Sequence, residues 1–138
     1  MKKLFQCSVI LIFLCSPFYA NTQQDSGPSY EALNFVQSWL KLVDNGRYAD
    51  SWHDLAATFK QEVAQNQWVQ ELEGFRSPLG KRLERGRLLV TRSSDPAVGD
   101  YVVFQFESTF ENRKAAREAV SVIKDDDGSW GVLGYSIF

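Results

Sequence analysis

The sequence predicts an α+β domain in which three N-terminal helices pack on one face of a curved, four-stranded antiparallel sheet. Between residues 30 and 72 apolar side chains recur at helical spacing, whereas from residue 83 onward they recur with a period of two. Helices that precede the strands, rather than alternate with them, are typical of a domain whose helices cover one face of an antiparallel meander.

Length and composition fit one packed domain. The chain has 138 residues, of which 44% are hydrophobic and 14% aromatic. The aromatic share favours a packed core over disorder. Fifteen basic residues against seventeen acidic ones give a net charge of −2, so the sequence predicts no nucleic-acid partner.

The first twenty residues have the order of a secretory signal peptide. Lys2 and Lys3 precede an apolar run over residues 4–19, and Ala20 is a small residue just before a polar segment. We therefore expect cleavage after Ala20, a periplasmic or secreted protein, and no membrane span after cleavage. Loss of the two lysines would bring the net charge to −4.

Two alternatives stay open for this leader. Phe18 is bulky for the cleavage motif, so the leader could instead be retained as a membrane anchor. Cys15 could be the lipid-attachment site of a lipoprotein, although Leu14 is bulky where such sites carry a small residue. Both cysteines lie within the leader, so residues 21–138 contain none. The sequence predicts no disulfide, metal site or cofactor for them.

A flexible lead-in is expected over residues 21–29 and a single domain over residues 30–138. Ser29 is expected to cap the first helix, which ends at Asp44-Asn45-Gly46 because glycine tolerates the left-handed turn after a helix. The apolar stripe of this helix comprises Leu33, Val36, Leu40 and Val43.

Two further helices and four strands follow. A short helix is expected from Tyr48, and a third from Phe59 to Leu72, because Thr58 and Gln61 have capping-box spacing. The strands are expected over residues 83–92, 101–110, 117–124 and 129–138, with the turn Asp125-Asp126-Asp127-Gly128 before the last. The inward face of the second strand comprises Val102, Phe104, Phe106 and Phe110.

A series of turn and aromatic residues runs through this pattern. It comprises Asp44-x-Gly46-x-Tyr48-x-x-Ser51-Trp52, Trp68, Arg76-x-x-Leu79-Gly80, Gly99-x-Tyr101, Asp127-Gly128-x-Trp130 and Gly134-Tyr135. The series resembles a bacterial family of unknown function numbered 4019. The resemblance implies a cystatin-like or nuclear-transport-factor-2-like roll, a cone of helices and sheet. It implies no activity, so no catalytic residue is carried over.

Three features of the sequence are compatible with a chemical or binding role but also have structural explanations. His53 is the only histidine and is expected on the helix flank. The aspartate run lacks the glycine and glutamate of a calcium loop and is interpreted as a polar turn. The first strand is basic, which is compatible with an anion contact, although we interpret it as a solvated outer face. Its basic residues include Lys81, Arg82, Arg85, Arg87 and Arg92.

The favoured hypothesis is an exported, non-enzymatic domain that binds a small ligand or a protein partner through its concave helix–sheet face. A small enzyme that moves protons on an apolar ligand in a cone-shaped pocket, through a tyrosine or His53, is the alternative, and homodimerisation through the sheet face is a third. Arg76 and Arg85 are expected to reach Glu118 or a helix C-terminus in a structural role. The candidate pocket or interface residues are Tyr48, Trp52, Trp68, Arg76, Arg85, Tyr101, Glu118 and Tyr135.

Overall fold

The computed structural model describes residues 28–138, and the predicted signal peptide and its cleavage site lie outside this range. Within it the helices come first and the strands after, which confirms the α+β class. The helices are α1 (Pro28–Asp44), α2 (Tyr48–His53), α3 (Ala57–Glu62) and α4 (Gln65–Phe75), followed by the 3-10 turn η1 (Ser77–Leu79). The strands are β1 (Arg82–Asp95), β2 (Gly99–Phe110), β3 (Arg113–Lys124) and β4 (Trp130–Ile137).

The first helix begins slightly before its predicted start. Pro28 is its first residue, so Ser29 lies inside the helix, and the predicted lead-in is shorter at this end. Proline suits a first helical position because the missing N–H would have no partner there. The predicted end is confirmed, since Gly46 has a φ of +71° and its N–H donates to the carbonyl of Val43 at 3.1 Å.

The predicted third helix is wrong in its extent, because the chain breaks it at Val63 and Ala64. Val63 has an extended backbone and a buried side chain, and its carbonyl accepts the indole N–H of Trp52 at 2.9 Å. The predicted capping box at Thr58 is also wrong. Gln67 instead accepts the backbone N–H of Ala64 at 3.1 Å, which supports the start of α4. The three predicted helices are therefore four.

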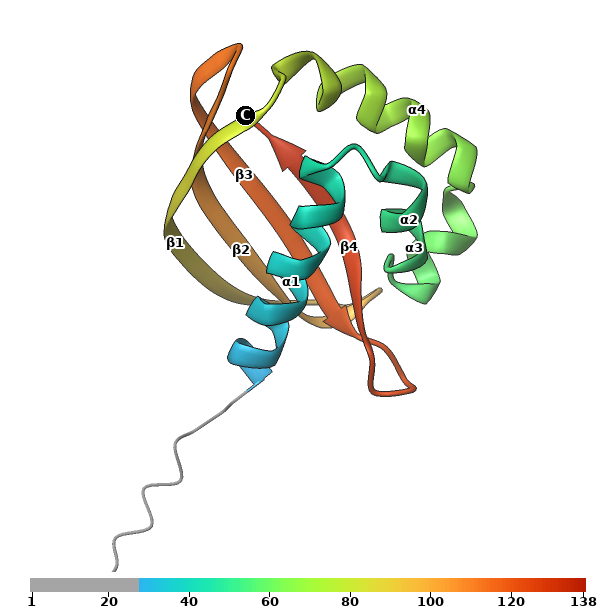
Figure 1. The fold of residues 1–138 in the computed structure, drawn as a ribbon. Coiled ribbons are helices and arrows are strands. Elements are labelled where there is room, and N and C mark those ends of the chain that lie inside the picture. Colours follow the sequence, from blue (N-terminus) through green and yellow to red (C-terminus); the bar gives the residue numbers. More distant parts are fainter. Residues whose placement is uncertain (1–27) are drawn as a thin grey trace, which may run out of the picture.

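The four strands form an antiparallel meander in the order β1-β2-β3-β4. Alternate side chains of β2 from Val102 to Phe110 are buried against the helices, as the period of two predicts. The predicted sheet is nevertheless incomplete, because Leu55 adds a fifth segment, one residue long, as a parallel bridge to Val132 of β4. Figure 1 shows α1 crossing the front of the sheet, while α2, α3 and α4 lie beside β4.

The bridge depends on a glycine. The N–H of Ala56 donates to the carbonyl of Val132 at 2.8 Å, and the N–H of Val132 donates to the carbonyl of Asp54 at 2.9 Å. A Cβ on the preceding residue, Gly131, would lie 2.5 Å from the Cα of Ala56. The close approach of the two backbones therefore requires a residue without a side chain.

A continuous apolar core fills the space between α1 and the sheet. Three of its large side chains, Trp39, Phe104 and Leu40, are at most 1% exposed. Trp68 packs against Trp39 with ring centroids 6.3 Å apart and joins α4 to this core. Among residues 28–138 no helix is both long and apolar enough to cross a bilayer.

Candidate functional site

Glu118 of β3 is a fully buried carboxylate at the centre of a polar network inside the concave face. It accepts from the guanidinium of Arg85 through Nε at 2.6 Å and Nη2 at 3.0 Å. The hydroxyls of Ser108 and Tyr135 donate to its two oxygens, each at 2.6 Å. Such a buried charge is tolerated only because opposite charge and hydrogen bonds compensate its lost hydration.

Asp44, the last residue of α1, is the second carboxylate of the network. It accepts from Arg85 through Nη1 at 2.8 Å and Nη2 at 3.0 Å, and from Arg82 through Nε at 2.9 Å. A third arginine, Arg76, donates from Nη2 at 3.2 Å. The three arginines therefore hold the end of α1 against β1 and the loop that precedes it.

The register of β1 turns two of these arginines inward. The strand pairs with β2 through register shifts between Arg82 and Glu84 and between Gly86 and Leu88. Arg85 consequently lies opposite Ser108 of β2, on the buried face. The interpretation of the basic strand as a solvated outer face is therefore wrong for Arg82, which pairs with Asp44, whereas Arg85 has one of its two expected partners, Glu118.

Arg76 lies at the end of α4 and is 2% exposed. Its Nη1 donates to the carbonyl of Gly80 at 2.8 Å, and its guanidinium carbon lies 4.6 Å from the ring centroid of Phe110. Its Nε has no hydrogen-bond partner among residues 28–138. Arg76 thus reaches the C-terminal residue of α1, one of the two targets expected from the sequence, while Arg85 reaches Glu118.

Together these residues form the carboxylate–arginine network, a term used below for Asp44, Arg76, Arg82, Arg85, Ser108, Glu118 and Tyr135. Burial raises the pKa of Asp44, but hydrogen bonds and charge from Arg85, with bonds from Arg76 and Arg82, outweigh it and hold the pKa below its ordinary value. Burial, followed by the charge and hydrogen bond of Glu118, raises the pKa of Tyr135 well above its ordinary value. Near neutral pH the carboxylate of Asp44 is thus ionised and the phenol of Tyr135 is protonated.

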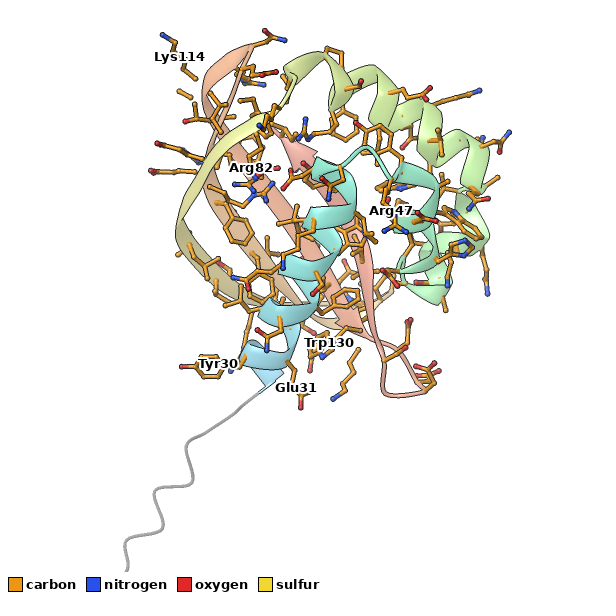
Figure 2. All side chains as sticks on the ribbon, viewed as in Figure 1. Tyr30, Glu31, Arg47, Arg82, Lys114 and Trp130 are labelled. Atoms are coloured by element: carbon orange, nitrogen blue, oxygen red, sulfur yellow. The ribbon has the colours of Figure 1, made fainter. Side chains whose placement is uncertain are left out.

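A groove opens to the surface next to the network, between α1 and β1. It has a volume of about 380 Å³. We call it the α1–β1 groove, and its lining residues are Gln37, Leu40, Lys41 and Asp44 of α1, Arg82, Arg85, Gly86 and Leu88 of β1, and Phe106 of β2. Figure 2 shows Arg82 between β1 and the C-terminal end of α1. Both walls of the groove, that of α1 and that of β1, carry charged side chains as well as apolar ones.

The network is built to hold charge rather than to exchange protons with a ligand. Every carboxylate oxygen of Asp44 and Glu118 already accepts two hydrogens from the protein. A general base needs a free lone pair within reach of the proton that it removes. Among the described residues, moreover, no group of three or more His, Cys, Asp or Glu side chains is placed to hold a metal ion.

The structure brings together four of the eight candidate residues, namely Arg76, Arg85, Glu118 and Tyr135. Tyr48, Trp52 and Trp68 pack among the helices instead, and the indole N–H of Trp68 donates to the hydroxyl of Ser51 at 2.9 Å. Tyr101 lies apart, in a second surface pocket of about 620 Å³ that Trp130 also lines. The role of the eight as a ligand or partner surface stays a prediction.

The sequence pattern did not single out three members of the network. Ser108 carried a signal, because it is the one polar side chain at an inward position among Val102, Phe104, Phe106 and Phe110. In the sequence Asp44 reads as part of a helix-ending turn and Arg82 as part of a basic run. Their pairing depends on tertiary contacts more than thirty positions apart in the chain, which periodicity does not reveal.

Outside the network, two features have the structural roles expected from the sequence. His53 is exposed at the end of α2, with its Nε2 at 3.3 Å from the side-chain nitrogen of Gln65. The aspartate run forms the β3–β4 turn, in which the N–H of Gly128 donates to the carbonyl of Asp125 at 2.8 Å. Gly128 has a φ of +84°, as such a turn requires.

Fold and site together define a small α+β domain with a buried carboxylate–arginine network under an open groove. The chain belongs to the family of proteins of unknown function DUF4019, whose model matches residues 35–135. This span includes every member of the network and all of the groove-lining residues. No curated protein and no solved structure matches the chain significantly.

Proposed function

We propose that this protein is an exported, non-enzymatic binding module that receives a ligand or partner on its concave helix–sheet face, at the α1–β1 groove. The observation that carries the proposal is the contrast between the two parts of that face. The interior between α1 and the sheet is packed with side chains, whereas the groove beside it is open and lined by both apolar and charged groups. Mixed lining of this kind is typical of small-ligand sites.

The alternative of a proton-transferring enzyme has less support. It requires an acid or base that a ligand can reach, and the candidates inside the concave face are the buried Glu118 and the partly buried Tyr135. The hydroxyl of Tyr135 donates to Glu118, and its raised pKa keeps the proton in place near neutral pH. Glu118 is 0% exposed and has all its acceptor positions in use. Binding therefore fits the geometry better than catalysis.

We further propose a cystatin-like or nuclear-transport-factor-2-like roll and export to the periplasm or the exterior. The fold proposal is supported by the curved antiparallel meander with helices on one side (Figure 1). The export proposal is supported by the basic start and apolar run of residues 1–20. N-terminal sequencing of protein recovered from the cell envelope tests export, with Asn21 expected first and an intact Met1 contradicting it.

Native mass spectrometry of protein purified from its own host tests the binding function. We expect a copurifying small molecule or partner chain that is lost in Leu88→Gln and kept in Leu89→Gln. These leucines are matched neighbours on β1, but Leu88 lines the groove and Leu89 lies against Gln105 on the other face. Equal retention by both variants, or the mass of the bare chain in the wild type, would contradict binding at the groove.

A further inference from the structure

We infer that the ligand of the α1–β1 groove is an amphipathic carboxylate, with its anionic head at Arg82 and Lys41 and its apolar part along Leu88 and Val90. The inference rests on the proposed binding function and adds the chemical class of the ligand. It follows from the charge count of the network, the free donors of one arginine and the placement of exposed apolar surface.

The charges of the network do not cancel. Three guanidinium groups, those of Arg76, Arg82 and Arg85, face only the two carboxylates of Asp44 and Glu118. Lys41 adds a further cation on the same side of α1 as Asp44, since the two residues are three positions apart and both line the groove. The groove therefore has a surplus of positive charge and attracts an anion.

Arg82 has donors to offer to that anion. Its side chain is 35% exposed, and its Nε donates to Asp44. Among residues 28–138 its two terminal nitrogens have no hydrogen-bond acceptor. The planar fork of a guanidinium matches the two oxygens of a carboxylate, so Arg82 can bind an anionic head without giving up Asp44.

Apolar surface continues from this cationic end. Leu88 lies opposite the buried Phe106, on the helix-facing side of the sheet, and is 40% exposed in the groove. Two positions further along, Val90 faces the same way and is 39% exposed. An apolar chain laid on these side chains would remove them from water while its head stays at Arg82.

Charge and apolar surface together select one class of ligand. A simple inorganic anion would leave the side chain of Leu88 exposed to water, and an uncharged lipid would leave the terminal nitrogens of Arg82 without an acceptor. A nucleic acid or a highly charged phosphate is poorly suited, because Asp44 lies in the groove and the surplus of charge is small. An amphipathic monocarboxylate satisfies both parts of the site.

The test is a titration of the full chain with three eight-carbon probes, followed residue by residue from amide chemical shifts. Octanoate carries the proposed head, octanol lacks the charge, and octyltrimethylammonium reverses it. We expect octanoate alone to shift the amides of Gln37, Lys41 and Leu88, with an affinity that falls as salt is added.

Matched variants then locate the head and the apolar part. Arg82→Gln should weaken octanoate binding about tenfold, because a charge-assisted hydrogen bond is lost. Arg47→Gln should leave it unchanged, since Arg47 pairs with Asp50 on the other side of α1 (Figure 2). Leu88→Gln should weaken binding severalfold and Leu89→Gln should not. If Arg82→Gln does not fold, Lys41→Gln, on an exposed helical position, replaces it with a severalfold loss expected.

The outcomes separate the inference from the proposed function. Equal binding of octanol and octanoate in the groove would overturn the carboxylate inference and leave the binding function intact. The absence of groove shifts with all three probes would overturn the inference as well. The binding function would fall only if the protein from its host also carries no ligand or partner in the native mass spectrum.

Discussion

Arg85 and Glu118 form a two-pronged ion pair between strands that are not neighbours, with Nε to Oε2 at 2.6 Å and Nη2 to Oε1 at 3.0 Å. The pair spans β2 and includes the hydroxyl of Ser108 on that strand. Because Arg85 also holds Asp44, a single side chain connects β1, β3 and the end of α1. The concave face of the sheet is thereby fixed in position at the groove.

Removing the charge of Glu118 should strongly destabilise the fold. In Glu118→Gln the partly buried Arg85 loses one of its two anionic partners, and breaking a buried pair costs about 3–5 kcal/mol. Urea unfolding at pH 7 measures the loss. Glu73→Gln, at an exposed position of α4, should stay within about 0.5 kcal/mol of the wild type. A loss of similar size in both variants would mean that the network contributes little.

Asp44 should make stability fall in acid. Its pKa in the fold is held below the ordinary value of 3.8, so its contribution is fully present above that value and is lost as the pH drops through the folded pKa. Unfolding free energies between pH 7 and 2.5 should therefore decline less steeply in Asp44→Asn than in the wild type. Parallel curves below pH 4 would show that the arginines do not stabilise this carboxylate.

Loss of the Tyr135 hydroxyl should lower the free energy of unfolding at neutral pH. Tyr135→Phe removes the 2.6 Å hydrogen bond to Glu118, and a bond to a charged group contributes about 1.5–3 kcal/mol. Since its pKa is raised, the contribution is present below the ordinary value of 10.0 and is lost as the pH rises through the folded value. Urea unfolding from pH 7 to 11 checks both effects, with the exposed Tyr30→Phe expected to match the wild type.

Two glycines of β4 offer a paired test of the bridge to Leu55. A methyl group at Gly131 would meet the backbone of Ala56 at 2.5 Å, whereas at Gly134 it would meet nothing within 4 Å. Gly131→Ala should therefore cost about 1–3 kcal/mol through forced displacement of the backbone. Gly134→Ala should be neutral or stabilising by less than about 1 kcal/mol. Thermal unfolding of both variants suffices, and equal melting temperatures would count against the close approach.

Local chemistry made much of the fold predictable from the sequence. Gly46 and Gly128 mark turns because both adopt positive φ, and the alternation along β2 identifies its buried face. The break at Val63 was not predictable in this way. Its extended backbone satisfies the indole of Trp52, a contact between residues eleven positions apart that is absent from local helix signals.

The site was predictable only in part. Arg76 and Arg85 were each expected to reach Glu118 or a helix C-terminus, and Arg85 is the one that meets Glu118. Arg82 and Arg85 share the inward face although they are three positions apart, because a register shift that no turn residue announces lies between them. The bridge at Leu55 was missed for a related reason, since one paired residue leaves no periodic pattern. The pairing of side chains from three elements depends on the tertiary structure. In the sequence its clearest sign is the polar Ser108, which lies among apolar residues on the inward face of β2 and donates to Glu118.

We propose that this protein binds its ligand or partner at the α1–β1 groove. The decisive measurement compares amide spectra of the protein as purified from its host with spectra after solvent extraction of bound molecules. We expect changes concentrated at Gln37, Lys41 and Leu88, three of the residues that line the groove. Identical spectra, or changes confined to Leu89, Gln105 and Arg117 on the opposite face, would contradict it.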